Sequence, residues 1–309
     1  MMGTYGRLAY VVPVGPTCVP DFVCDTVESI VYYDPCGIVL VVDDSGRGTG
    51  HRALTHCNPG RSQIIVVQTA GRSGKGPGLY LVLSEGLKRA ADFTGITGIV
   101  RMDTDALIIN RGLNEAVTAF FNANPKVGIA GSHWIASNGQ LRDVSGVAAR
   151  VRHVVSIFWP VRHPRRTLRR PLLLRDWLFV RKLVFTARRN GYVWGEHCMG
   201  GAYVLNPRLL TALKCRNWLH RREFLYTGLE EDAIFAILTY GAGFTLADFA
   251  TDGKPLGVKW KGLPFSPEEL VRRGKSLIHS TRFWEGMNEC EIRGFFASIR
   301  LRGVIAHEG

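Results

Sequence analysis

The chain has 309 residues, of which 46% are hydrophobic, and a formal net charge of +13 at pH 7. This length and apolar content are enough to bury a full core, so a disordered chain is excluded. The apolar runs are all shorter than the about 20 residues that a membrane-spanning helix needs, and the first residues carry no signal-peptide pattern. Seven cysteines, an odd number without Cys-x-x-Cys spacing, indicate neither a disulfide framework nor a zinc site. We therefore expect reduced cysteines and a cytoplasmic protein.

Short β-rich runs alternate with helical segments in the first half, which is typical of an α/β sheet. Within it, Ile38–Val42 is apolar without interruption, as in a parallel strand that is buried on both faces. Leucines at four-residue spacing over 79–87 predict a helix, and a second helix is expected over 113–122. The strands expected in this half are 8–14, 38–43, 64–68, 99–102 and 127–131.

A basic segment interrupts this pattern at 146–192. Between Arg162 and Arg189 it contains nine arginines and one lysine against Asp176 alone. Such a concentration of charge indicates an anionic partner, which could be nucleic acid, acidic lipid or a phosphorylated acceptor. A merely solvated face explains it less well, because the charges cluster. We interpret the segment as a basic helical insertion.

The α/β pattern resumes after the insertion, with strands expected over 200–205 and 244–248 and a helix over 230–240. Asn206 and Pro207 are typical of a helix cap and first helical residue, and Ser266 to Glu269 form a capping box. We expect one domain over 1–309, with a nucleotide-binding half at 1–135, the insertion at 146–192 and an acceptor and catalytic half at 193–309.

Three acidic clusters lie at expected strand ends or helix starts: Asp43–Asp44, Asp103 with Asp105, and Glu230 to Asp232. In an open α/β sheet, ligands gather at the carboxyl ends of the strands, so these clusters can converge on one site. Asp103-Thr104-Asp105 directly follows an apolar strand, where a turn can bring both carboxylates to a hard cation that also contacts phosphate oxygens. Asp-x-Asp is common in surface turns, but its position after a strand favours metal binding.

The order of these motifs resembles that of GT-A-fold glycosyltransferases, nearest to the family 2 group. The resemblance covers about residues 8–135 and 197–250. It rests on the following segments: Val11-Val12-Pro13, Val41 to Gly46, Gly74-Lys75-Gly76, the Asp103/Asp105 pair, Gly200-Gly201, and Glu231-Asp232 with Gly243 downstream. It implies a Rossmann-like, mostly parallel sheet flanked by helices.

The resemblance also implies an activity and a donor site. The enzyme would move a sugar from a nucleotide-sugar, first of all a UDP-sugar, with Mn²⁺ or Mg²⁺ held by Asp103 and Asp105 against the diphosphate. By the same resemblance, Asp43 or Asp44 would bind the base or ribose, and Pro13 would belong to the same nucleotide site. The nucleotide would also lie near two basic residues, Arg72 and Lys75. The plainer alternatives are an Asx turn for the aspartates and an exposed loop charge for Lys75.

Glu231-Asp232 matches the motif whose carboxylate takes the proton of the acceptor hydroxyl. Asp232 is the first candidate for this base, and Glu231 is the alternative because three consecutive acids blur the register. The plainer interpretation is favourable negative charge at a helix N-terminus.

A late histidine, His279, is a candidate for a further metal ligand, with Arg282 near the diphosphate. A buried structural histidine is the alternative. The feature departs from the plainest family 2 pattern, so inversion at the sugar carbon is expected while retention stays open.

The acceptor side is the least defined by the sequence. Trp194 and His197 precede the glycine pair, and the acceptor candidates in the insertion are Arg165, Arg166, Arg169 and Arg170. We expect an envelope glycan or polyprenyl-phosphate-linked saccharide at a membrane surface, with a hydroxyl-bearing modified base in DNA as the alternative. A degenerate domain that only binds nucleic acid or membrane is a further alternative. Nucleotidyl transfer fits less well, because residues 13–20 lack its Gly-rich signature.

Overall fold

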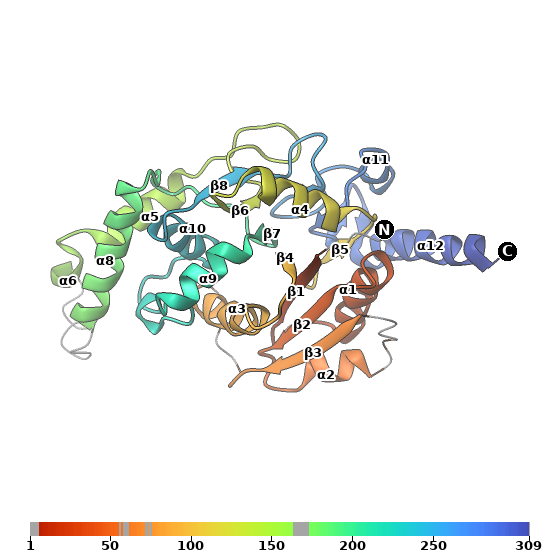
Figure 1. The fold of residues 1–309 in the computed structure, drawn as a ribbon, viewed down its shortest axis with the longest axis horizontal. Helices are drawn as coiled ribbons and strands as arrows, with labels where there is room; N and C mark the ends of the chain where they lie inside the picture. Colours follow the sequence, from red (N-terminus) through yellow and green to blue (C-terminus); the bar gives the residue numbers. More distant parts are fainter. Residues whose placement is uncertain are drawn as a thin grey trace.

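The computed structural model of the chain describes residues 6–55, 57, 62–71, 74, 76–162 and 173–308. A seven-stranded sheet forms its centre, in the order β3-β2-β1-β4-β7-β6-β8 (Figure 1). β1 to β4 are parallel, whereas β7 runs antiparallel to both of its neighbours. The strands are β1 (Arg7–Val14), β2 (Ile38–Asp43), β3 (Gln63–Gln68), β4 (Ile96–Met102), β6 (Val127–Gly131), β7 (Ala202–Leu205) and β8 (Thr245–Asp248).

Helices cover both faces of this sheet, because alternate residues of its strands point to opposite sides. Ala9 and Val11 of β1 belong to one core cluster, and Leu8, Tyr10 and Val12 belong to the other. The first cluster is built with α3 (Pro77–Ala90), α5 (Ser145–Val155), α8 (Leu173–Arg189), α9 (Pro207–Cys215) and α10 (Glu231–Gly241). The second is built with α1 (Pro20–Tyr33), α2 (Thr49–Leu54) and α4 (Leu113–Ala123). The fold class predicted from the sequence, a mostly parallel α/β sheet flanked by helices, is confirmed.

Several helices and strands agree with the sequence prediction, chiefly those marked by an uninterrupted apolar run or by a capping side chain. β2 and β6 have the predicted bounds, and β7 is shorter by two residues than expected because Gly200 and Gly201 form a turn. The side chain of Asn206 accepts a hydrogen bond from the backbone N–H of Arg208, as a helix cap does. The side chain of Ser266 likewise caps α11 (Pro267–Arg272).

A second, three-stranded sheet has the order β5-β10-β9. Its strands are β5 (Ala106–Ile108), β9 (Leu256–Val258) and β10 (Leu277–His279). β10 pairs antiparallel with β5, so that His279 is in register with Ala106. The hairpin β11 (Phe283–Trp284) and β12 (Met287–Asn288) and the helix α12 (Glu289–Glu308) follow. This small sheet joins the last part of the chain to the residues that follow β4.

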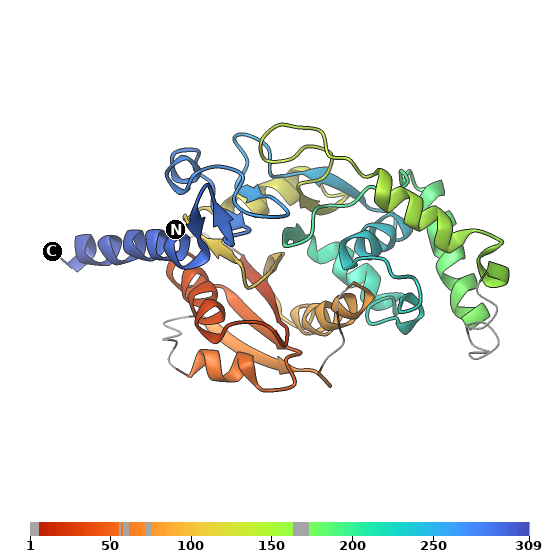
Figure 2. The ribbon, with the colours of Figure 1, turned by 180° about the vertical axis from the view of Figure 1, so that it is seen from behind.

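The basic insertion is helical in its described parts: α5, α6 (Trp159–Arg162) and α8. These helices lie at one end of the long axis of the molecule and α12 at the other (Figures 1 and 2). α8 packs on α10 and on the 3-10 turn Arg222–Phe224, which anchors the insertion to the sheet. Among the described residues, no helix is both long and apolar enough to cross a membrane.

Candidate active site

The Asp103–Asp105 turn lies at the carboxyl end of β4, a central strand of the main sheet. The chain adds β2 and β3 on one side of β1 and β4 on the other, so the strand order reverses between β1 and β4. Crevices for ligands form at such reversal points. The turn is fixed by backbone and side-chain bonds: the N–H of Asp103 donates to Gly201 O at 2.7 Å, and Thr26 Oγ1 of α1 donates to Thr104 O at 2.9 Å.

Asp103, Asp105 and His279 form one cluster, with their ligand atoms all within 4.8 Å of one another. His279 Nε2 lies 3.4 Å from Asp105 Oδ1 and 3.9 Å from Asp103 Oδ2. His279 Nδ1 lies 2.9 Å from the carbonyl oxygen of Lys259, which can only accept a hydrogen bond. Nδ1 therefore carries a proton, and Nε2 is the ring nitrogen that faces the two carboxylates.

Close packing determines where the His279 ring lies. Gly201 has a φ of +94°, and a Cβ built on it would overlap the ring atoms of His279. Because only glycine fits both the backbone angle and the close approach, the Gly200-Gly201 pair has a direct structural role at this site. The sequence predicted both the histidine and the glycine pair, but not their contact.

Asp105 is held in its ionised form. Ser280 Oγ donates to its Oδ2 at 2.9 Å, and Arg282 Nε lies 2.7 Å from the same oxygen. Burial raises the pKa of Asp105, but His279 together with Arg282 and Ser280 outweighs burial and lowers the pKa well below its ordinary value. Arg282 is 65% exposed, so one side of its guanidinium faces solvent beside the cluster.

Arg101 connects the Asp103 side of the cluster to α10, and sequence reasoning missed it. The side chain is 1% exposed, and its Nη2 lies 3.0 Å from Asp103 Oδ1 and 2.8 Å from Glu231 Oε1. Burial opposes its charge, yet Asp103 and Glu231 raise the pKa of Arg101 above its ordinary value. Within the described part of the chain, Arg101 Nε and Nη1 and the Tyr203 hydroxyl have no hydrogen-bond partner. Such buried unsatisfied groups are rare and are typical of functional sites.

The three acids at the start of α10 have different environments. Glu230 is half exposed, with its carboxylate 3.9 Å from Arg150. Glu231 is buried, and burial raises its pKa to about 8 against the opposing effect of Arg101. Asp232 is 14% exposed, and its Oδ2 accepts from the N–H of Gly200 at 3.0 Å. Gly201 therefore positions the cluster of Asp103, Asp105 and His279, and Gly200 positions Asp232.

His197, predicted on the acceptor side, lies next to Asp232. Its Nε2 is 3.7 Å from Asp232 Oδ2 and 2.7 Å from Arg142 Nη2, while its Nδ1 is 2.8 Å from Gly195 O. The guanidinium can only donate and the carbonyl can only accept, so Nδ1 carries the proton and the imidazole is neutral. Burial lowers the pKa of His197, and Asp232 acts in the opposite direction.

Asp43 and Asp44 hold the loop after β2. Asp43 is buried and accepts from the N–H groups of Ser45 at 2.9 Å and Gly50 at 2.8 Å, which is the Asx-type turn named as its plainer role. Asp44 accepts from the hydroxyl of Thr69. Pro13 lies beyond the last residue of β1 that pairs with β4, where its missing N–H is tolerated. A contact of these three residues with a nucleotide stays a prediction.

Several predicted site residues lie outside the described residues. They are Arg72 and Lys75 on the donor side and Arg165, Arg166, Arg169 and Arg170 on the acceptor side. Trp194 is described, and its ring is faced by the guanidinium groups of Arg152 and Arg188 at 5.8 and 5.2 Å from the ring centroid. It joins α5 to α8, and its contact with an acceptor stays a prediction.

Comparison with known proteins gives matches among solved structures alone. No protein-family model and no curated protein matches the chain. The chain is similar to the mannosyltransferase PcManGT from Pyrobaculum calidifontis, solved with GDP-Man and Mn²⁺, at 18% identity and a TM-score of 0.43, over 79% of this chain and 54% of that one. It is similar to the galactosyltransferase LgtC at 9% identity and a TM-score of 0.47, over 94% and 95% of the two chains. It is also similar to TarS from S. aureus at 15% identity and a TM-score of 0.43, over 79% and 58%.

The chain thus spans about half the length of the mannosyltransferase it matches. At these identities and TM-scores the likenesses carry no information on substrate or reaction. Function is therefore inferred from the side chains of the site.

Two residues of the site, Arg101 and Arg142, were not predicted from the sequence. Arg101 could have been found, because it is the single charged residue in the strand Ile96–Met102. Arg142, which donates to three backbone carbonyls around His197, has no comparable signal.

Proposed function

We propose that the chain is a metal-dependent glycosyltransferase that moves a hexosyl group from a nucleotide-sugar, in the first instance a UDP-sugar, to an acceptor hydroxyl. The observation that carries this proposal is the convergence of the Asp103, Asp105 and His279 cluster with Glu231 and Asp232 at the carboxyl end of β4. Arg101 bonds to both groups, so the two motifs belong to one site.

The donor set suits a divalent metal. Carboxylates and an imidazole nitrogen are ligands that Mn²⁺ accepts, and Mg²⁺ accepts the carboxylates with water. Bound there, the ion would neutralise the diphosphate as the nucleotide leaves. The exposed face of Arg282 adds a positive charge beside Asp105, where a phosphate oxygen can reach it.

Asp232 is the base in this proposal. Its carboxylate is partly exposed and is oriented by the N–H of Gly200, whereas Glu231 is buried and held by Arg101. Asp232 would take the proton of the acceptor hydroxyl as that oxygen attacks the sugar carbon. His197, neutral and 3.7 Å away, would help to position this carboxylate. Because Glu231 is buried against Arg101, Asp232 is left to act as the base, and the reaction we propose is a single displacement with inversion.

Donor binding tests the proposal directly. UDP and UDP-glucose, with other nucleotide-sugars to follow, should bind in the presence of Mn²⁺ or Mg²⁺ and lose binding in EDTA. Asp103→Asn and Asp105→Asn should each weaken this binding at least tenfold, because one charged ligand is lost in each. Asp252→Asn is the control: it removes an aspartate that is 80% exposed and far from these residues in sequence, and it should leave donor binding unchanged.

Two outcomes would contradict this assignment. Full activity in EDTA would exclude the metal role of Asp103 and Asp105. Metal-dependent donor binding without any donor hydrolysis or transfer, over a broad screen of acceptors, would instead identify a degenerate binding protein.

For the acceptor, we propose a phosphorylated glycolipid, such as a polyprenyl-phosphate-linked saccharide, at an anionic membrane surface. α8 carries three exposed apolar residues on one stripe: Leu174, Leu178 and Phe185, with 47%, 52% and 41% of their surface exposed. Ile157 and Phe158 add two more exposed apolar side chains before α6. Exposed cations lie along one side of the stripe, at Arg175, Lys182 and Arg189. An apolar stripe edged with cations fits an anionic bilayer, whereas a DNA backbone gives such a stripe nothing to bury.

A binding comparison separates membrane from DNA. Wild type should bind phosphatidylglycerol-containing vesicles and retain part of this binding at high salt. A triple Gln variant at 174, 178 and 185 should bind these vesicles about 100-fold more weakly, at about 1 kcal/mol for each half-exposed side chain. Leu141→Gln, at a residue 82% exposed elsewhere, is the matched control.

Replacing the four insertion arginines by alanine tests the same partner through charge. The variant, changed at Arg165, Arg166, Arg169 and Arg170, should keep nucleotide binding and weaken vesicle binding. Duplex DNA binding with a linear dependence on log salt, unaffected by the triple Gln change, would identify DNA as the partner instead.

A further inference from the structure

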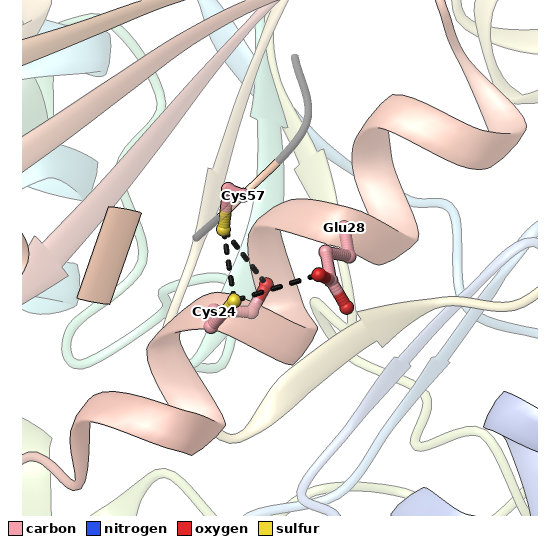
Figure 3. A group of neighbouring side chains, drawn as sticks. All are labelled: Cys24, Glu28 and Cys57. Carbon is pink, nitrogen blue, oxygen red and sulfur yellow. Dashed lines mark hydrogen bonds between the residues drawn. The ribbon is translucent and has the colours of Figure 1, made fainter. Parts of the chain in front are cut away.

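Two half-buried cysteines that are distant in sequence meet at the surface of α1. Cys24 lies in α1, and Cys57 follows α2. Their Sγ atoms are 2.8 Å apart, and Cys24 Sγ lies 3.6 Å from Oε1 of Glu28, one helical turn further on (Figure 3). All three donor atoms lie within 4.8 Å of one another. The cysteine spacing in the sequence did not indicate this cluster, because its two halves lie on different elements.

The chemistry of the three groups suits a cation. Positions i and i+4 of a helix, here Cys24 and Glu28, project to one side and chelate metals well. Burial raises the pKa of the Cys24 thiol, and the nearby Cys57 and Glu28 raise it further. Burial also raises the pKa of Cys57. Both thiols are therefore held in the protonated form, and a cation bound by them would have to displace their protons.

We propose that Cys24, Glu28 and Cys57 bind a thiophilic divalent cation, with Zn²⁺ as the reference ion. Two thiolates and a carboxylate are zinc ligands, and water can complete four-coordination because Glu28 is exposed to solvent. Zn–S bonds of about 2.3 Å at a tetrahedral angle place two sulfurs about 3.8 Å apart. The thiols would therefore separate by about 1 Å, which Cys57 can accommodate since it lies outside any helix or strand.

This site differs from the one at Asp103 in ligand chemistry and position. Thr26 of α1 donates to the Asp103–Asp105 turn, and Cys24 projects from a different side of the same helix. A bound ion would tie α1 to the chain that leads from α2 into β3. Its expected effect is on stability, independent of the proposed transferase activity.

Cobalt spectroscopy on the 309-residue chain tests the proposal. Co²⁺ is added under anaerobic, reducing conditions to the Asp105→Asn protein, which weakens the other metal site. The proposal predicts a thiolate-to-cobalt charge-transfer band in the near ultraviolet, which Zn²⁺ displaces. Cys24→Ser and Cys57→Ser should each abolish the band. Glu28→Gln, a change at an exposed position, should weaken cobalt affinity at least tenfold while the band persists.

Matched controls and one rival chemistry complete the test. Cys215→Ser and Cys290→Ser change exposed cysteines elsewhere and should leave the band unchanged. Absence of the band in the reduced protein, or a band that survives Cys24→Ser, would overturn the proposal. A disulfide between Cys24 and Cys57 in the air-exposed protein, located by peptide mass spectrometry and accompanied by no cobalt uptake after reduction, would also overturn it.

Discussion

Replacing Gly201 by alanine should impair the proposed metal site without removing a ligand. The added methyl would lie closer than 3.0 Å to the His279 ring, a distance that real Cβ atoms essentially never show. The ring must therefore shift away from Asp103 and Asp105. Misorientation of a ligand typically weakens metal binding 10- to 100-fold, or about 1.4 to 2.7 kcal/mol. Backbone strain at a φ of +94° adds about 1 to 3 kcal/mol against folding, which a domain of ordinary stability survives.

Mn²⁺ titration followed by electron paramagnetic resonance measures this effect, with circular dichroism to check the fold. Gly139→Ala is the matched control, because Gly139 has a φ of +83° and nothing within 4 Å of the added methyl. It should lose stability through strain and keep its Mn²⁺ affinity. Unchanged Mn²⁺ affinity in the folded Gly201→Ala protein, or an equal loss in Gly139→Ala, would refute the role given to the contact with His279.

Three further outcomes are expected. Asp232→Asn should lower turnover about 10²- to 10⁴-fold and leave donor binding intact in isothermal calorimetry; normal turnover with an inactive Glu231→Gln would move the base by one residue. Glu231 has a pKa of about 8 in the fold against 4.5 ordinarily, so the folded state binds its proton more tightly. Its contribution to stability should be greatest at acid pH and fall as pH rises from about 4.5 to about 8. Glu231→Gln should therefore flatten the melting temperature over this range in EDTA, and an unchanged profile would contradict the shift. Asn206→Ala should cost about 1 to 2 kcal/mol in urea unfolding, because the cap of α9 and its bond to Val127 O are lost; a cost near zero would argue against the cap.

Local sequence patterns predicted the elements whose physics is local. The uninterrupted apolar run of β2 and the capping box at Ser266 leave little choice of structure. The acids Asp103 and Asp105 were found because they directly follow a buried strand. The small sheet was not predicted, because three-residue strands such as β10 are too short to show a period.

Pairings between distant residues were beyond reach of the sequence. His279 was a candidate ligand by resemblance, yet its hydrogen bond to Lys259 and its contact with Gly201 depend on β9 and β10 meeting. Cys24 and Cys57 come together only because α1 packs on α2. Arg101 is an exception to the rule that charged residues are not buried in strands. The two acids that pair with it, Asp103 and Glu231, lie on different elements, so the sequence could not show the pairing.

The position of β10 late in the chain has a consequence for folding during synthesis. Asp105 is synthesised 175 residues before Ser280, whose hydroxyl donates to its carboxylate. Arg293 of α12 then donates to Thr104 O at 2.5 Å. A nascent chain that has completed the strands of the first half therefore has an incomplete site. Under the proposed function, metal-dependent donor binding would begin only once the C-terminal segment has docked. It would then stabilise the complete fold relative to partly folded states by mass action.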